Sequence, residues 1–225
     1  PSIPYTLFLK VLPDSKSLTD FVGKIVGEKV SELGNYSVYY SDKNYYLPHF
    51  YAPTSIIPYG YKNDLFEENV SFFVDSKEKD SRIGYMRNEI CAKFYSPSDC
   101  RQDKIKINNI PTIGFKKINP TKYKVVISNA KIPFFLIFSD KFHKDWKAFI
   151  LNREPEKLKV QESYFGGSIQ EYNHENIFLD SKTFETLGMK SLPEIQHASI
   201  NGYANVWYIT PIDSEGKDNY EIIIE

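Results

Sequence analysis

Six aromatic, imidazole and amide side chains in the second half of the chain have the chemistry of a sugar-binding site. Tryptophan and tyrosine rings can pack against the C–H faces of a sugar, while histidine and asparagine exchange hydrogen bonds with its hydroxyl groups. The same residue types also serve as core aromatics and structural histidines, and core packing is the simpler interpretation of the two tryptophans. The candidate ligand-binding residues are Trp146, Trp207, Tyr203, His143, His197 and Asn205.

Residues that could catalyse a reaction form no specific pattern. The carboxylate pairs Asp140 with Asp145 and Glu154 with Glu156 could hydrolyse a glycosidic bond, but such pairs are expected by chance among 29 acidic residues. Neither cysteine has the local signature of a nucleophile, and no CxxC or HxxxH spacing indicates a metal site. We therefore predict that this chain has no catalytic residues, cofactor or metal of its own.

The two cysteines allow two interpretations. Eight residues separate Cys91 from Cys100, and Pro97 and Ser98 between them favour a turn. A local disulfide bond is sterically feasible and would fit an oxidising compartment. Two free thiols are the alternative, and the sequence leaves both open.

The composition excludes some classes of protein. With a formal net charge of −1, the chain lacks the surplus of lysine and arginine that a general nucleic-acid binder needs. No apolar run reaches the roughly 18 to 20 residues that span a bilayer. The 17 tyrosines and 16 phenylalanines favour strands over helical bundles. A length of 225 residues fits one domain over residues 1–225.

The spacing of the apolar residues predicts a short N-terminal helix followed by a mainly β chain. Residues 1–35 form the predicted helical segment, with a cap at 17–20 and apolar residues at helical spacing from Phe21 to Leu33. The run 133–139 is almost entirely apolar, as in a strand that is buried on both faces. Further strands are predicted at 123–128, 146–151 and 220–225, and residues 153–194 are interpreted as an insertion with a short helix at 181–187.

Asn201-Gly202 predicts a β-hairpin with a type I′ turn, because it joins two β-rich runs. A two-residue turn would pair Ile200 with Tyr203 and Ala198 with Asn205. On the other face it would pair His197 with Val206.

Several of these segments together resemble the C-terminal non-membrane domain of YfhO-like proteins, which are large polytopic membrane proteins of the GT-C glycosyltransferase type. The resemblance implies an antiparallel β-sandwich, jelly-roll-like and similar to carbohydrate-binding modules, on the extracytoplasmic face of the cytoplasmic membrane. It also implies that catalysis depends on acidic residues of a membrane portion that nothing here matches. Residues 153–194 depart from the family pattern. The resemblance rests on 46–53, 119–123, 128–130, 134–139, His143, 146–148, His197, 201–203, Asn205 and Trp207.

Three functions are compatible with these features. The first is a non-catalytic extracytoplasmic domain of a membrane glycosyltransferase, with a glycan or lipid-linked saccharide and its own transmembrane portion as partners. The second is a free-standing protein that binds or cleaves glycans. The third is a purely structural domain that packs on its membrane portion and binds nothing.

Overall fold

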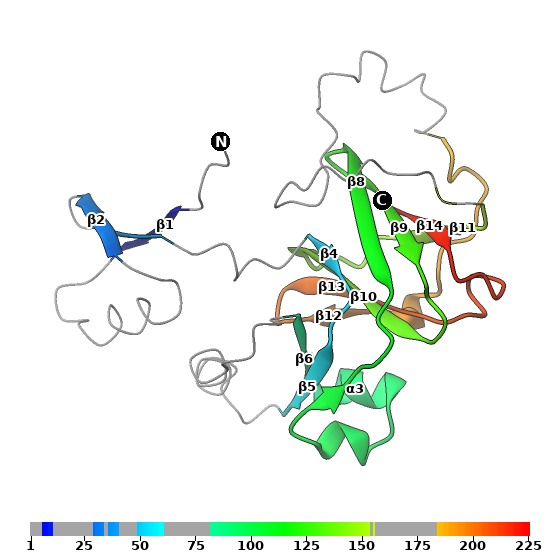
Figure 1. Cartoon of the computed structure of the whole chain (residues 1–225), viewed down its shortest axis with the longest axis horizontal. Coiled ribbons are helices and arrows are strands. Elements are labelled where there is room, and N and C mark those ends of the chain that lie inside the picture. Colours follow the sequence, from blue (N-terminus) through cyan, green and yellow to red (C-terminus); the bar gives the residue numbers. More distant parts are fainter. Residues whose placement is uncertain are drawn as a thin grey trace. The chain divides into compact units, whose positions relative to one another are not determined.

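The chain divides into two compact units. The structure is a computed structural model that describes residues 6–10, 29–33, 36–40, 49–60, 82–153, 155 and 184–225. The first unit comprises residues 1–46 and 61–81, and the second comprises residues 47–60 and 82–225 (Figure 1). This division differs from the single domain over residues 1–225 that the sequence predicts.

The described part of the first unit is a three-stranded antiparallel sheet. Its strands are β1 (Thr6–Lys10), β2 (Lys29–Leu33) and β3 (Tyr36–Tyr40), in the order β1-β3-β2. The predicted N-terminal helix is wrong over β1 and β2, and residues 11–28 lie outside the described part. Two residues, Gly34 and Asn35, separate β2 from β3, and these types suit a tight turn between strands as well as they suit a helix end.

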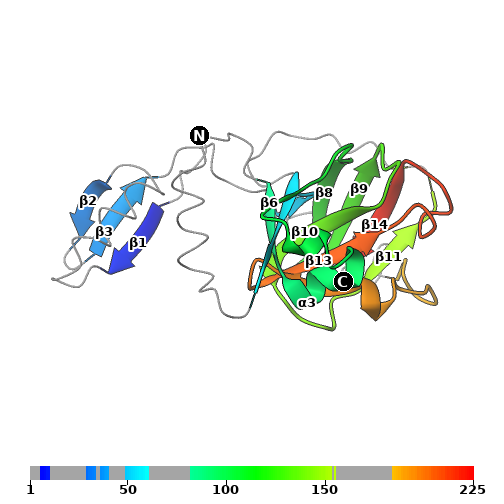
Figure 2. The ribbon, with the colours of Figure 1, turned by 90° about the horizontal axis from the view of Figure 1, so that it is seen from below.

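The second unit contains two four-stranded antiparallel sheets. One has the order β12-β13-β10-β4, and we call it the middle sheet; the other has the order β11-β14-β9-β8, and we call it the outer sheet (Figure 2). The strands of the middle sheet are β4 (Phe50–Tyr51), β10 (Phe134–Lys141), β12 (His197–Ile200) and β13 (Ala204–Ile209). The strands of the outer sheet are β8 (Thr112–Asn119), β9 (Lys122–Ser128), β11 (Ala148–Leu151) and β14 (Tyr220–Ile224).

A shared hydrophobic core joins the two sheets into a β-sandwich, which confirms the predicted fold class. Alternate residues of a strand point to the same face. Accordingly, Val125 and Ile127 of β9 and Ile222 of β14 are fully buried against Leu136 and Phe138 of β10. The alternation of apolar residues that predicted strand 123–128 therefore arises from its packing on the middle sheet.

The middle sheet is buried on its second face as well. There Phe135 and Ile137 of β10 pack against a small third sheet, together with a helix and a 3-10 turn. The prediction that the apolar run 133–139 is buried on both faces is confirmed, because every residue of Phe134–Phe138 is buried. The third layer consists of β5 (Ser55–Tyr59), β6 (Ile83–Arg87), β7 (Ile105–Lys106), α3 (Asn88–Phe94) and η2 (Asp99–Arg101).

Gly84 of β6 allows the third layer to approach the middle sheet closely. A Cβ atom at this position would lie 2.7 Å from Cδ1 of Ile56 and 2.8 Å from Cδ1 of Ile200. Such distances are shorter than carbon–carbon contact allows, so only glycine fits between the two layers without movement.

The hairpin forms the predicted type I′ turn, but its register differs from the prediction by one residue. Asn201 and Gly202 have φ angles of 56° and 76°, and the Tyr203 amide donates a hydrogen bond to the Ile200 carbonyl. Ile200 nevertheless pairs with Ala204, and Tyr203 is an extra residue between turn and strand. The cause is burial: this register places Ala204 on the same buried face as Ile200.

Much of the predicted insertion, residues 154 and 156–183, lies outside the described residues. The predicted helix at 181–187 is wrong for residues 184–187, which form a turn with a hydrogen bond from the Leu187 amide to the Phe184 carbonyl. Gly188 follows with a φ of 79°. A short 3-10 helix, η4 (Glu194–Gln196), then leads into β12.

Candidate functional site

The six predicted ligand-binding residues gather where the chain crosses from the middle sheet to the outer sheet. The crossover consists of residues 142–147, between the end of β10 and the start of β11. His143 and Trp146 lie on the crossover itself, whereas His197, Tyr203, Asn205 and Trp207 belong to the neighbouring hairpin. The two motifs that carry the family resemblance therefore meet in space.

Asn205 holds this crossover against the sheet and is itself completely buried. Its Nδ2 lies 2.9 Å from the Asp140 carbonyl oxygen and 3.2 Å from that of Lys141, and it donates to both. Its Oδ1 accepts a hydrogen bond from the His143 amide at 3.2 Å and contacts His197 Nε2 at 3.1 Å. Because Asn205 uses both N–H groups and accepts two bonds, it is fully occupied by the framework.

The Asn205 contacts stabilise an irregularity in β10. Phe138 pairs with Asn205 and Lys141 pairs with Ala204, so two extra residues of β10 bulge between these pairs. The carbonyl of Asp140 in this bulge accepts its hydrogen bond from the side chain of Asn205. A buried carbonyl without a partner is costly, which explains why an amide side chain occupies this position.

His197 and Trp207 form a stack beside Asn205. Their ring centroids are 4.5 Å apart and their planes differ by 4°, and Phe142 of the crossover covers the imidazole at 5.2 Å. Since Oδ1 of Asn205 only accepts hydrogen bonds, the proton of His197 lies on Nε2. Burial lowers the pKa of His197 and outweighs the hydrogen bond with Asn205, which acts in the opposite direction. Trp207 is only 1% exposed and belongs to the sandwich core.

The other three predicted residues remain accessible to different degrees. Tyr203 is 53% exposed, and its carbonyl accepts a hydrogen bond from the Phe142 amide. The His143 side chain is exposed, with Nδ1 3.4 Å from a carboxylate oxygen of Asp145. Trp146 is half-buried and packs edge-to-face on Phe138, with ring centroids 4.9 Å apart.

Cys91 and Cys100 form a disulfide bond in the third layer of the domain. Cys91 lies on α3 and Cys100 on η2, and both are buried in the core beneath the middle sheet. The bond closes a short loop that carries α3 and therefore fixes this helix against Phe135 and its neighbours. Of the two interpretations that the sequence left open, the structure contains the disulfide.

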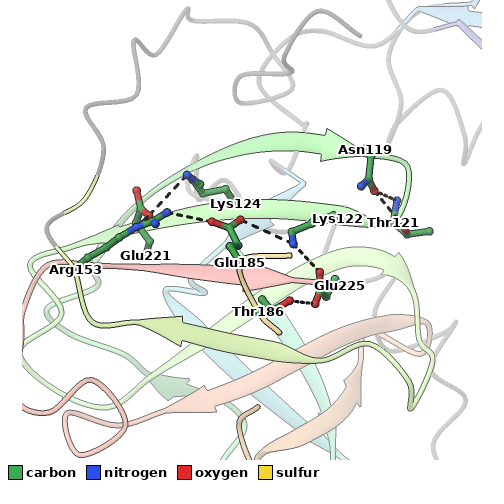
Figure 3. Close-up of polar contacts among 9 residues, drawn as sticks. All are labelled: Asn119, Thr121, Lys122, Lys124, Arg153, Glu185, Thr186, Glu221 and Glu225. Atoms are coloured by element: carbon green, nitrogen blue, oxygen red, sulfur yellow. Dashed lines mark hydrogen bonds and ion pairs between the residues drawn. The ribbon is translucent and has the colours of Figure 1, made fainter. Parts of the chain in front are cut away.

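The outer sheet contains a buried ionic network that the sequence did not predict. The network covers the face of β9 and β14 that points away from the sandwich core, where lysines alternate with the core residues of β9 (Figure 3). Alternation of this kind ordinarily indicates a solvent-exposed face, so the sequence provides no signal of burial. The members of the network are Lys122, Lys124, Arg153, Glu185, Thr186, Glu221 and Glu225.

Glu221 is the centre of one half of this network and is completely buried. Its carboxylate lies 2.6 Å from Nε of Arg153 and 3.8 Å from Nζ of Lys124. A second nitrogen of Arg153 lies 3.3 Å from Glu185. Arg153 thereby ties the turn at 184–187 to the outer sheet.

Lys122 is the centre of the other half and is 2% exposed. Its Nζ lies 2.9 Å from Glu225 and 3.9 Å from Glu185, and the Thr186 hydroxyl donates to Glu225 (Figure 3). Among the described members, the side-chain carboxylates of the three glutamates balance the charges of the three basic residues. This balance fits a structural clamp that holds the turn at 184–187 on the sheet.

The described members of the carboxylate pairs considered from the sequence make local contacts. Asp140 accepts a hydrogen bond from the amide of Lys141, and Asp145 contacts His143. Glu154 and Glu156 lie outside the described residues. Within the described ranges, no group of three or more His, Cys, Asp and Glu side chains has the arrangement of a metal site.

No helix among the described residues is long and apolar enough to cross a membrane.

Comparisons with known proteins identify no relative of this chain. No protein family, no curated protein and no solved structure matches the sequence or the fold.

Proposed function

We propose that this chain is the non-catalytic extracytoplasmic domain of a membrane glycosyltransferase, where it helps to bind a glycan or a lipid-linked saccharide at the membrane surface. The resemblance of residues 119–148 and 195–209 to YfhO-like proteins suggests the parent protein. The β-sandwich architecture supports the proposal, since it is the fold that this resemblance implies.

The observation that carries the proposal is the disulfide between Cys91 and Cys100. Disulfide bonds form and persist in oxidising compartments and are rare in the reducing cytosol. Both cysteines of the chain are used in this one buried bond, so the domain is suited to the extracytoplasmic side.

The glycan-binding part of the proposal rests on the accessible aromatics. Asn205 and Trp207 serve the framework, so they are unsuited to contact a ligand. Trp146, Tyr203 and His143 retain accessible surface at the same crossover. Aromatic rings with nearby polar groups are the usual lining of saccharide sites.

The location is tested by trapping the cysteines in living cells that express the full-length protein. Free thiols are blocked with a membrane-permeant alkylating reagent before lysis, and the peptides that contain Cys91 and Cys100 are identified by mass spectrometry. The proposal predicts a disulfide-linked product. Recovery of both cysteines in alkylated form, with a periplasmic or secreted disulfide protein correctly oxidised in the same cells, would overturn it.

A purely structural domain is the second candidate, and the full occupation of Asn205 by framework bonds favours it. The two candidates differ in saccharide binding by the folded domain. Saturation-transfer NMR against neutral and acidic oligosaccharides separates them, because a purely structural domain gives no transfer to any of them. Turnover of an oligosaccharide by the domain alone would instead support a free-standing glycan-cleaving protein.

A further inference from the structure

Side chains from five separate elements converge at the end of the sandwich where β8 turns into β9. His49 precedes β4, Lys117 lies on β8, Tyr123 on β9, Asp140 on β10 and Trp146 on the crossover. We call these five residues the Tyr123 cluster. Of the six predicted ligand-binding residues, it contains only Trp146.

Aromatic contacts bring the rings of the cluster together. The Tyr123 ring lies 5.3 Å from the His49 ring and 6.2 Å from the Trp146 ring, measured between centroids. Phe138 packs beneath them, 4.9 Å from both His49 and Trp146, with its plane nearly perpendicular to each. Because Phe138 is completely buried in the core, it supports the rings from below.

Two opposite charges flank these rings. Nζ of Lys117 lies 5.9 Å from the centroid of the Tyr123 ring. The Asp140 carboxylate is close enough to raise the pKa of Tyr123, in addition to the larger effect of burial. Asp140 also acts on His49, whose pKa is nevertheless lowered because burial dominates, and Lys117 lowers it further. At neutral pH the cluster therefore contains one cation, one anion and an uncharged imidazole.

The polar atoms of the cluster are largely unused by the framework. Among the described residues, the His49 ring nitrogens, the Tyr123 hydroxyl, the Trp146 indole nitrogen and the Lys117 ammonium make no hydrogen bond. The backbones of His49 and Trp146 do so, with Ser139 and His143. Asp140 accepts one bond, from the amide of Lys141 at 2.7 Å. Tyr123 is 4% exposed and Trp146 is half-buried, and buried Trp and Tyr side chains usually find a partner for their polar atoms.

This pattern is the opposite of that at Asn205, where every donor is used. We propose that the Tyr123 cluster is a binding site for a neutral pyranose unit of a glycan, which rests on the glycan-binding role proposed above. Trp146 and His49, which are half-buried, offer ring surface to the C–H groups of the sugar, and Tyr123, which is 4% exposed, supports them. The unused donors and acceptors face its hydroxyl groups. Because the charges of Lys117 and Asp140 cancel, the site favours an uncharged sugar over a uronic acid or a sugar phosphate.

The two tryptophans of the chain provide a direct readout. In protein labelled with ¹⁵N-tryptophan, one indole signal belongs to Trp146 and the other to Trp207, and a Trp146→Phe variant assigns them. The probes are the methyl glycosides of glucose, galactose, mannose and N-acetylglucosamine, with glucuronic acid as the charged comparison. We expect at least one neutral glycoside to shift the Trp146 signal in a saturable manner, while the signal of the buried Trp207 stays in place.

Variants separate this site from binding elsewhere on the domain. Lys117→Ala removes a charged donor and Asp140→Asn replaces a charged acceptor by a neutral amide, and we expect each to weaken binding by about tenfold. Lys131→Ala is the matched control, because Lys131 is an exposed lysine beyond the opposite end of β9. It should leave the affinity unchanged.

Two results overturn the inference, and they bear differently on the proposed function. In the first, a neutral glycoside shows saturation transfer in both Lys117→Ala and Asp140→Asn and does not shift the Trp146 indole signal. The glycan then binds elsewhere on the domain, and the proposed function stands. Absence of both transfer and shift for every glycoside removes the site and the glycan-binding role together. Equal binding of glucuronic acid would contradict the predicted preference for a neutral sugar.

Discussion

Replacement of Asn205 by alanine tests whether this residue holds the framework of the sandwich. The side chain makes four contacts of 2.9–3.2 Å with the bulge in β10, the crossover and His197. Alanine removes all four and leaves two carbonyls, one amide and one imidazole N–H without their present partners. The sheets and the core are otherwise unchanged, so the loss of stability reports on these bonds.

The expected loss follows from the number of bonds and their surroundings. A typical hydrogen bond within a protein contributes about 1 kcal/mol net, so four bonds together contribute about 4 kcal/mol. The exposed side chains of Lys141 and His143 lie next to two of the partners, so water can replace part of the loss. We therefore expect the free energy of unfolding to fall by about 2–4 kcal/mol. That is a large part of the stability of an ordinary domain.

Urea unfolding monitored by tryptophan fluorescence measures this difference. Asn119→Ala is the matched control, because Asn119 accepts two bonds from Thr121 in an exposed turn of the same domain. It should cost less than about 1 kcal/mol. If Asn205→Ala unfolds in one cooperative transition within about 0.5 kcal/mol of the parent protein, the framework role assigned to Asn205 is refuted.

Three further predictions concern the layers around this site. Gly84→Ala should destabilise the domain by about 1–3 kcal/mol through overpacking, whereas Gly60→Ala, whose Cβ would lie 3.6 Å from its nearest neighbour, should be nearly neutral in urea unfolding; equal effects would contradict the packing argument. Replacing Cys91 and Cys100 together by alanine should lower the free energy of unfolding by about 2–3 kcal/mol, because the bond closes a short loop; a loss below about 1 kcal/mol would argue against this constraint. His197 should titrate below 6.5 in an NMR pH series, because burial lowers its pKa in the folded state. The contribution of neutral His197 to the free energy of unfolding is then fully present above pH 6.5 and is lost as the pH falls through the folded-state pKa. A measured pKa at or above 6.5 would refute the prediction that burial lowers it.

The sandwich could be predicted from the sequence because its signals are local. The alternation at 123–128 and the unbroken apolar run at 133–139 depend only on which faces of each strand are buried. The Asn201-Gly202 turn is equally local, since the φ angles of two residues decide its type. The register of its hairpin could not be predicted in this way. It depends on the burial of Ala204 against the third layer, and no local pattern contains that information.

The functional assignments were harder to predict for a related reason. Trp207 and Trp146 have the same residue type, and only their positions in the sandwich distinguish a core ring from an accessible one. Lys122 belongs to a strand whose alternation suggests solvent, although Glu185 and Glu225 cover it from remote segments. His49 lies almost a hundred residues from Trp146, so their convergence on Tyr123 requires the folded sheets.

The strand order has a consequence for how the domain is synthesised. β13 lies between β12 and β10, and β14 lies between β11 and β9, so late segments of the chain occupy interior positions in both sheets. Until β13 and β14 have left the ribosome, β12 and β11 have no neighbouring strand within their sheets. Such long-range pairing is slow, and it leaves the apolar face of β10 exposed until β13 and β14 have been synthesised. The two sheets are therefore expected to assemble only once β14 has been synthesised.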